Sequence, residues 1–473
     1  MGMDQKSNQG NQTVEEFGYK QELSRSLSFW DLLVYGLCLM VPIAPFAIYG
    51  YVAHASNGMV ALAYLIGMVG MIFTALSYAR MSEAFPIAGS VYSYAQRGIN
   101  EFVGFFAGWI FLLDYIFVPT LIYLVAAAAM SSILPGVPMV VWIILFIGIT
   151  TVLNIFGVKI TTAALKIILF LSIAVLLTFI AFGIIAIMNG INGAEFSFKP
   201  IYNPEFFSIG LVMSAVSIAV LSFLGFDAVS TLAEESKGDR KAIGKAIIIS
   251  LIVIGILFVV QTWIASLIVP DFNSFTDLDT AFYAVAEIVG GPWLKWVAAL
   301  VVAIAFGVAD ALIFQAAISR LLYSMARDKK LPAVFAKVHP KYQTPYTSTI
   351  IVAIISLIVA TLFTSQMDNL TAIVNFGALT GFMLLHLSVI NYFMRQRKSN
   401  DYMNHLVFPI IGLIIIGYVW ISLAPLAKII GGIWIAIGAI YMIYLKMKNK
   451  EAFLSSSKPE TQKNFGELKI DND

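Results

Sequence analysis

The stretch Val41-Pro42-Ile43-Ala44-Pro45 interrupts an apolar run that extends from residue 28 to 53. Each proline removes a backbone N–H and obstructs the carbonyl four residues earlier, so a continuous helix is disfavoured here. A second stretch, Ser-Phe-Leu-Gly-Phe-Asp at 222–227, places a glycine and a carboxylate inside the apolar run 207–232. Non-helical backbone within a membrane is tolerated only where it is buried in protein or lines a cavity. The two stretches therefore predict broken helices around a binding site.

The chain around these breaks is too apolar to fold in water. Of its 473 residues, 60% are hydrophobic and 12% are charged, whereas soluble domains carry about 25% charged residues. Twelve apolar runs are long enough to cross about 30 Å of hydrocarbon as helices. They are residues 28–53, 59–80, 102–130, 139–157, 161–188, 207–232, 244–269, 294–325, 347–365, 370–394, 405–424 and 429–446. We expect an all-α polytopic membrane protein with twelve transmembrane helices.

Composition also excludes several classes of protein. The net charge of +2 argues against a nucleic-acid binder with broad basic patches. The lone Cys38 excludes internal disulfides and cysteine metal cages, and the four histidines are scattered singly, so we expect no metal and no cofactor. We also expect that the protein is not an enzyme, because no catalytic dyad or metal cluster is evident in the sequence.

Positive charge predicts the orientation of the chain. If the N-terminus is cytoplasmic, the outer loops hold only Lys199, Lys295 and Lys428, and the other Lys and Arg residues lie on the inner side. We therefore expect a multi-pass plasma-membrane protein with cytoplasmic tails at 1–26 and 447–473. The acidic outer connection 270–293 contains AFYAVAEIV, which is typical of a short amphipathic helix.

The two breaks lie in the first and sixth spans, where a five-plus-five inverted repeat would place them. Repeat one would cover about 27–190, repeat two about 205–395, and two further helices about 405–446, within a transporter domain at 27–446. Freed N–H groups suit a carboxylate and freed carbonyls suit an ammonium group. The candidate backbone contacts to substrate are Val41, Pro42, Ile43 and Ala44 in the first break, and Phe223, Leu224, Gly225 and Phe226 in the second.

Charged residues inside the spans are the second signal, because they are costly there and usually functional. Asp114 and Tyr115 lie side by side in the third span and could bind an ammonium group by charge and by a cation–π contact. Asp114 could equally form a hydrogen bond between helices. Asp227 could contact substrate or could satisfy loose backbone donors after the break.

Two further charges are candidates for coupling transport to an ion. Lys166 lies about five residues into the fifth span, where it could extend to the cytoplasmic interface or act as a titratable cation. Asp310 lies in the eighth span about ten residues from its cytoplasmic end, so it could pair with Lys166.

Three motifs in order resemble the amino acid–polyamine–organocation family of permeases. They are FPIAGSVYSY at 85–94, FLGFDAVSTLAEE at 223–235 and SRLLYSMARDKKLP at 319–332. GWIFLLDY at 108–115 and NFGA at 375–378 are most similar to the bacterial putrescine importer branch. The resemblance implies the five-plus-five fold, a carrier coupled to a cation or to exchange, and a site built from spans one, three, six, eight and ten.

Two positions depart from the putrescine pattern. Ala47 stands where that pattern has an acidic residue, which favours a ligand with a single ammonium group. Lys166 matches a lysine that in sodium-independent amino acid carriers resembles a substitute for bound sodium. We therefore expect proton-coupled import of an amino acid or small organic amine by alternating access. The alternatives are a putrescine or polyamine importer, an amine–amino acid exchanger, and an amine sensor without transport.

Overall fold

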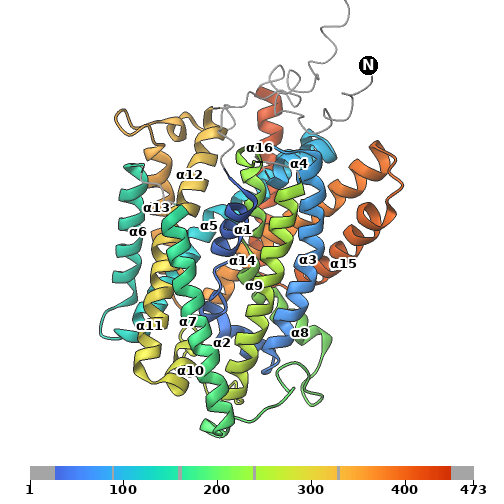
Figure 1. Ribbon diagram of the computed structural model, residues 1–473. Coiled ribbons are helices and arrows are strands. Elements are labelled where there is room, and N and C mark those ends of the chain that lie inside the picture. The colour runs from blue at the N-terminus through green and yellow to red at the C-terminus, as the bar shows by residue number, and fades with distance from the viewer. Residues whose placement is uncertain (1–26, 88–89, 158–161, 238–240, 328–330, 449–473) are drawn as a thin grey trace, which may run out of the picture.

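The structure is a computed structural model that describes residues 27–87, 90–157, 162–237, 241–327 and 331–448. The expected tails lie outside these residues, apart from Met447 and Lys448. Most of the described chain is helical (Figure 1). The helices are α1 Phe29–Leu39, α2 Pro45–Ala55, α3 Val60–Ala84, α4 Ser90–Gly98, α5 Glu101–Ile133, α6 Met139–Ile155, α7 Thr162–Met188, η2 Ile191–Gly193, α8 Ile209–Ala219, η3 Val220–Phe223, η4 Phe226–Glu235, α9 Lys241–Ile268, α10 Ala281–Gly290, α11 Pro292–Ile304, η5 Ala305–Asp310, α12 Ala311–Arg327, η6 Ala333–Ala336, α13 Tyr346–Leu362, α14 Met367–Val389, η7 Ile390–Gln396, η8 Met403–Val407, α15 Phe408–Ile421 and α16 Pro425–Lys448.

Most of the expected spans are present as single long helices. Within the described ranges, nine helical segments are long and apolar enough to cross a membrane. Four expected spans are shorter or divided: α6 and α13 have 17 residues each, the first span is split into α1 and α2, and the sixth is split into α8, η3 and η4. The short helix expected within 270–293 is confirmed as α10.

Local sequence explains where several helices begin. Ser28 and Asp31 form a capping box, in which the Ser28 side chain accepts from the Asp31 N–H and the Asp31 carboxylate accepts from the Ser28 N–H. Asn100 caps α5 by accepting from the Val103 N–H at 2.9 Å. Pro45 and Pro292 begin α2 and α11, where a missing N–H costs no helical hydrogen bond.

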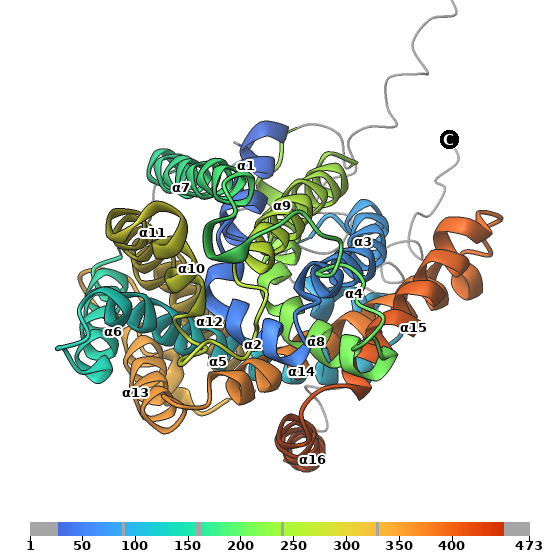
Figure 2. The same ribbon diagram turned by 90° about the horizontal axis from the view of Figure 1, so that it is seen from below.

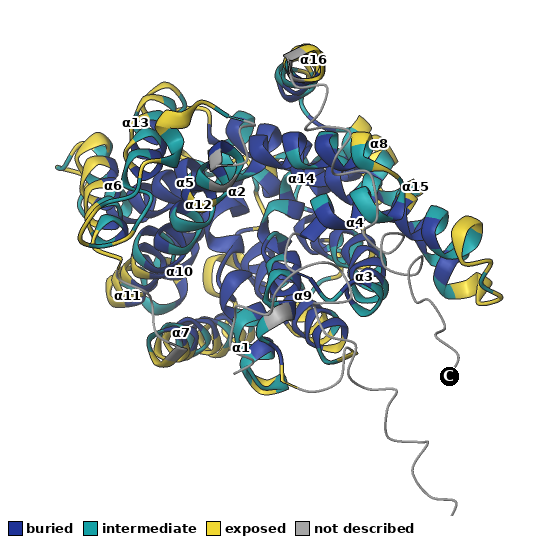
Figure 3. Ribbon diagram, turned by 90° about the horizontal axis from the view of Figure 1, so that it is seen from above, coloured by how far each residue is buried: buried dark blue, intermediate teal, exposed yellow. Residues whose placement is uncertain are grey.

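Helix α5 lies at the centre of the bundle and the last two helices lie at its edge. In the most apolar part of each helix, 83% of α5 is buried, compared with 22% of α15 and of α16. Figure 2 shows α15 and α16 at the periphery, and Figure 3 shows burial concentrated on the inner helices. The 33 residues of α5 extend about 50 Å at helical rise, which is more than the about 30 Å of hydrocarbon in a bilayer.

Two tryptophans attach α16 to α5. The Trp109 Nε1–H donates to the Trp434 carbonyl at 2.9 Å, and the Trp434 Nε1–H donates to the Trp109 carbonyl at 2.8 Å. Their rings stack with centroids 4.9 Å apart. The absence of a side chain at Gly438 lets α16 approach the Trp109 ring closely.

The two broken spans are also joined to each other, before α1 and after η4. The Leu27 N–H donates to the Glu235 carbonyl at 3.0 Å, and the Lys237 N–H donates to the Leu27 carbonyl at 2.7 Å. This parallel bridge holds the start of α1 against the end of η4.

Candidate binding site between the broken helices

The first break is present where the sequence predicts it. Helix α1 ends at Leu39 and α2 begins at Pro45, and Val41 has a φ of +42°. A β-branched residue rarely adopts this conformation, so the surroundings must hold it in place. One interaction that stabilises the break is a hydrogen bond from the Gln261 amide to the Pro42 carbonyl, at 3.0 Å.

The second break follows η3. Gly225 has a φ of +111°, and the chain resumes as the 3₁₀ helix η4 rather than as an α-helix. The Asp227 carboxylate accepts from the Gly225 N–H at 3.3 Å. The expectation that Asp227 satisfies loose backbone donors is therefore confirmed by geometry.

The two breaks are in direct contact. A Cβ atom on Gly225 would lie 2.5 Å from the Leu39 carbonyl oxygen, so any side chain here would collide with the end of α1. Glycine is needed both for its positive φ and for this close backbone approach.

A cavity of about 80 Å³ lies beside both breaks. A cavity needs about 10–15 Å³ to hold one water molecule, so this cavity has room for a small organic molecule. Three carboxylates border it: Asp114 from α5, Asp227 from η4 and Asp310 from η5. Each of these residues is buried. Such a concentration of carboxyl groups in apolar surroundings suits a cationic ligand, which would stabilise their ionised form.

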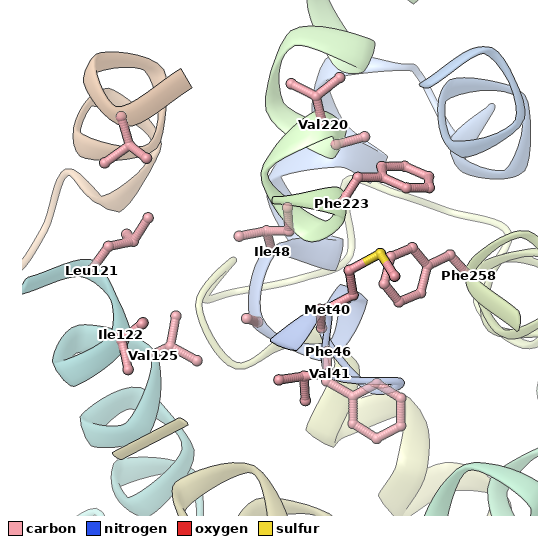
Figure 4. Packing of buried hydrophobic residues seen from close by; sticks show 14 of the residues in the cluster. Met40, Val41, Phe46, Ile48, Leu121, Ile122, Val125, Val220, Phe223 and Phe258 are labelled. Carbon is pink, nitrogen blue, oxygen red and sulfur yellow. The ribbon is translucent and has the colours of Figure 1, made fainter. Parts of the chain in front are cut away.

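The rest of the wall is aliphatic and aromatic. Figure 4 shows Leu121, Ile122 and Val125 of α5 facing Ile48 and Val41. Phe306 and Phe314, on either side of Asp310 in the chain, also line the cavity. These wall residues were not expected from the sequence, because apolar side chains that face a ligand cannot be distinguished there from those that face lipid.

Asp114 and Tyr115 both line the cavity, as expected. The buried Asp114 Oδ1 has no hydrogen-bond partner among the described residues. A buried acceptor without a partner is costly, so this oxygen is available to a ligand. The alternative hydrogen bond between helices does not form at this atom.

The candidate backbone residues divide into two groups. Val41, Ala44, Leu224 and Gly225 line the cavity. Pro42, Ile43, Phe223 and Phe226 do not line it. Phe223 packs against Tyr64 and Phe258, and Phe226 packs against Tyr78 and Phe382. Pro42 instead lines a smaller cavity with Cys38 and Asp310.

The expected pairing of Lys166 with Asp310 is wrong in this conformation. The Lys166 Nζ lies 3.5 Å from the Asp31 Oδ1, and the Lys166 side chain is 54% exposed. Asp310 is buried at the cavity instead. The long lysine side chain reaches the bundle surface near the start of α1, because Lys166 itself lies only in the second turn of α7.

Asp310 lies at the end of η5, a segment of π-helix between α11 and α12. π-helical turns inside α-helices are rare and often mark functional sites. The charge of Asp310 identifies it as a candidate in the sequence, whereas the π-helix was not predicted from the sequence.

Comparison with known proteins identifies the family. Residues 31–455 match the model of the amino acid permease family. The chain belongs to this family. It is 31% identical over 427 residues to the low-affinity putrescine importer PlaP of Escherichia coli (strain K12), an alignment that covers 89% of this chain and 93% of PlaP.

Two further relatives come from Bacillus subtilis (strain 168). The branched-chain amino acid permease BcaP is 26% identical, with 91% of this chain and 95% of BcaP covered. A methylthioribose transporter is 27% identical, with 92% and 96% covered. The chain is therefore a multi-pass membrane protein of a transporter family, and the resemblance drawn from its motifs is confirmed.

Proposed function

We propose that the protein is a secondary active transporter that imports an amino acid or small organic amine across the plasma membrane. The observation that carries the proposal is the acidic cavity at the meeting point of two helix breaks. A site bounded by interrupted helices can be exposed to either side when the segments on that side move, which is the basis of alternating access. The relatives PlaP, a putrescine importer, and BcaP, a branched-chain amino acid permease, support this function.

The proposed arrangement has twelve membrane spans, of which the first ten form a five-plus-five inverted repeat. Both termini would be cytoplasmic. Val41 and Gly225 have positive φ values where α1–α2 and α8–η4 are interrupted, which supports the proposal that these two spans carry the breaks.

Coupling to protons is part of the proposal. Asp310 would bind or release a proton beside the substrate, because it is buried at the same cavity. Lys166 would hold α7 to α1 through Asp31 and change partner as the inner segments move.

Uptake by purified protein in proteoliposomes tests the function. We expect a radiolabelled amine or amino acid to accumulate above its external concentration when the outside is acidic, and accumulation to stop when an ionophore collapses the pH gradient. Binding without accumulation of any tested solute would instead indicate a sensor. Exchange that requires a preloaded second solute would indicate an amine–amino acid exchanger.

A further inference from the structure

Helix α2, the second half of the first broken span, forms one wall of the cavity. It contributes Ala47 and Ile48 to the lining, and Ala44 lies at its start. In the proposed topology α2 is the outer half of the span, so it is one of the segments that move when the cavity opens to the outside. The contacts on the other side of α2 therefore influence when the cavity can open.

Those contacts are made by residues 275–282, which we call the outer strap: the end of the connection before α10 and the start of α10. A Cβ atom on Gly50 would collide with the Leu278 carbonyl oxygen, so the backbone of α2 touches the strap directly. The Phe46 and Phe282 rings stack with centroids 3.7 Å apart. This packing leaves little room for water between α2 and the strap.

A carboxyl group lies at the edge of this contact. The Tyr51 hydroxyl donates to the Asp279 Oδ1 at 2.7 Å, which joins α2 to the strap by a hydrogen bond. Asp277, also in the strap, and Asp368, in the first turn of α14, are close enough to repel a negative charge on Asp279. Among the described residues, no Lys, Arg or His forms an ion pair with any of these three carboxylates. A negative charge on Asp279 is therefore poorly balanced while the strap is packed against α2.

This environment changes how readily Asp279 binds a proton. Burial raises the pKa of Asp279 to about 6; the Tyr51 hydrogen bond opposes the rise, and the carboxylates Asp277 and Asp368 add to it. When α2 and the strap separate, the Asp279 carboxyl returns to water, where the pKa of an aspartate is about 3.9. The packed state has the higher pKa, so it becomes more favourable as pH falls.

We propose that the outer strap is a pH-sensitive gate, in which a proton on Asp279 holds the strap against α2 and closes the cavity toward the outside. The inference rests on the proposed transport function, because the gate controls access to the cavity where cargo would bind. Asp279 stays on the outer side, so its proton controls a step of the cycle and does not cross the membrane with the cargo. Acid outside then promotes closure over bound cargo.

A distance across the contact tests the gate. Nitroxide labels are attached to His54→Cys, near the end of α2, and to Thr276→Cys in the strap, both exposed positions, in a Cys38→Ser background. Pulsed and continuous-wave electron paramagnetic resonance then measures the distance in purified protein without cargo. We expect the ratio of the shorter to the longer distance to rise about 10-fold between pH 8 and pH 5. Because the label replaces His54, titration of that histidine cannot produce the response.

Two variants assign the response to Asp279. Asp279→Asn is neutral at every pH, so its distance ratio should change less than about 2-fold over the same range. Tyr51→Phe removes a hydrogen bond that favours the ionised carboxylate, so the midpoint of the response should move to higher pH. The matched control is Asp271→Asn, an exposed acid of the same connection, which should respond as the parent protein does.

Three results would overturn the gate. They are a distance distribution that does not change with pH, a response that survives in Asp279→Asn, and a shift toward the longer distance in acid. If Asp279→Asn does not fold, the direction of the midpoint shift in Tyr51→Phe decides, because a loss of packing alone would not move the midpoint to higher pH.

Uptake into proteoliposomes keeps the gate and the transport function apart. If the parent protein accumulates no solute, the transport function is overturned, while the distances, measured without cargo, still decide the pH response of the strap. Accumulation by Asp279→Asn should still require a pH gradient, because Asp279 does not carry the coupled proton. Accumulation by this variant without a gradient would overturn the assignment of Asp279 to the gate alone.

Discussion

At the scale of single residues, the ion pair between Lys166 and Asp31 gives the sharpest test of coupling. The pair is partly exposed, so its loss should cost roughly 0–1 kcal/mol of stability. Lys166→Ala should therefore fold normally and yet lose uptake driven by a pH gradient. Proteoliposome uptake after an acid jump measures this, with the exposed Lys199→Ala as control. Undiminished proton-driven uptake would remove Lys166 from the mechanism.

Asp279 gives a residue-scale prediction about pH. It lies in the connection before α10, and the Tyr51 hydroxyl donates to its Oδ1 at 2.7 Å. Burial, with smaller contributions from the nearby carboxylates Asp277 and Asp368, raises the pKa of Asp279 to about 6. A raised pKa means that the folded protein favours the protonated carboxyl, so this group stabilises the fold increasingly as pH falls through about 6.

The variant Asp279→Asn lacks this titration. The melting temperature of the unmodified protein should rise relative to that of the variant as pH is lowered from 8 to about 5. Melting curves of both proteins in detergent at several pH values measure the difference. A difference that stays constant with pH would contradict the prediction.

At the scale of elements, the contact between the two breaks makes Gly225 irreplaceable. Gly225→Ala would force an L side chain to a φ of +111° and against the Leu39 carbonyl, at a cost of about 1–3 kcal/mol or more. We expect a lower melting temperature and weaker ligand binding. Gly417→Ala is the matched control, because the nearest atom to its Cβ would be 4.0 Å away and alanine favours a helix. Equal effects of the two substitutions would mean that the breaks are not in close contact.

The same elements show what sequence can and cannot predict. Both breaks lie within the stretches predicted from the sequence, 41–45 and 222–227, because proline and glycine act on the backbone locally and independently of the fold. The sequence does not predict the partner of Lys166 or the hydrogen bond from Gln261 to the Pro42 carbonyl, because both depend on which helices become neighbours. For the same reason no local signal in the sequence indicates the paired tryptophans that join α16 to α5.

At the scale of the whole molecule, the distribution of basic residues predicts the orientation in the membrane. In a Cys38→Ser background, Glu205→Cys and Lys337→Cys place single thiols at exposed positions separated by three expected spans. A membrane-impermeant thiol reagent should label the first in intact cells and the second only after lysis. The reverse pattern would invert the proposed topology.

The bridge between Leu27 and the end of η4 has a mechanical consequence for the transport cycle. Helix α1 and η4 touch at the level of the breaks and are fastened again at their far ends. Because they are joined at both ends, α1 and η4 should move as one rigid unit and not independently of each other. Release of cargo to the inside would then require α1 and η4 to move in one concerted step. A crosslink that immobilises either segment should also immobilise the other.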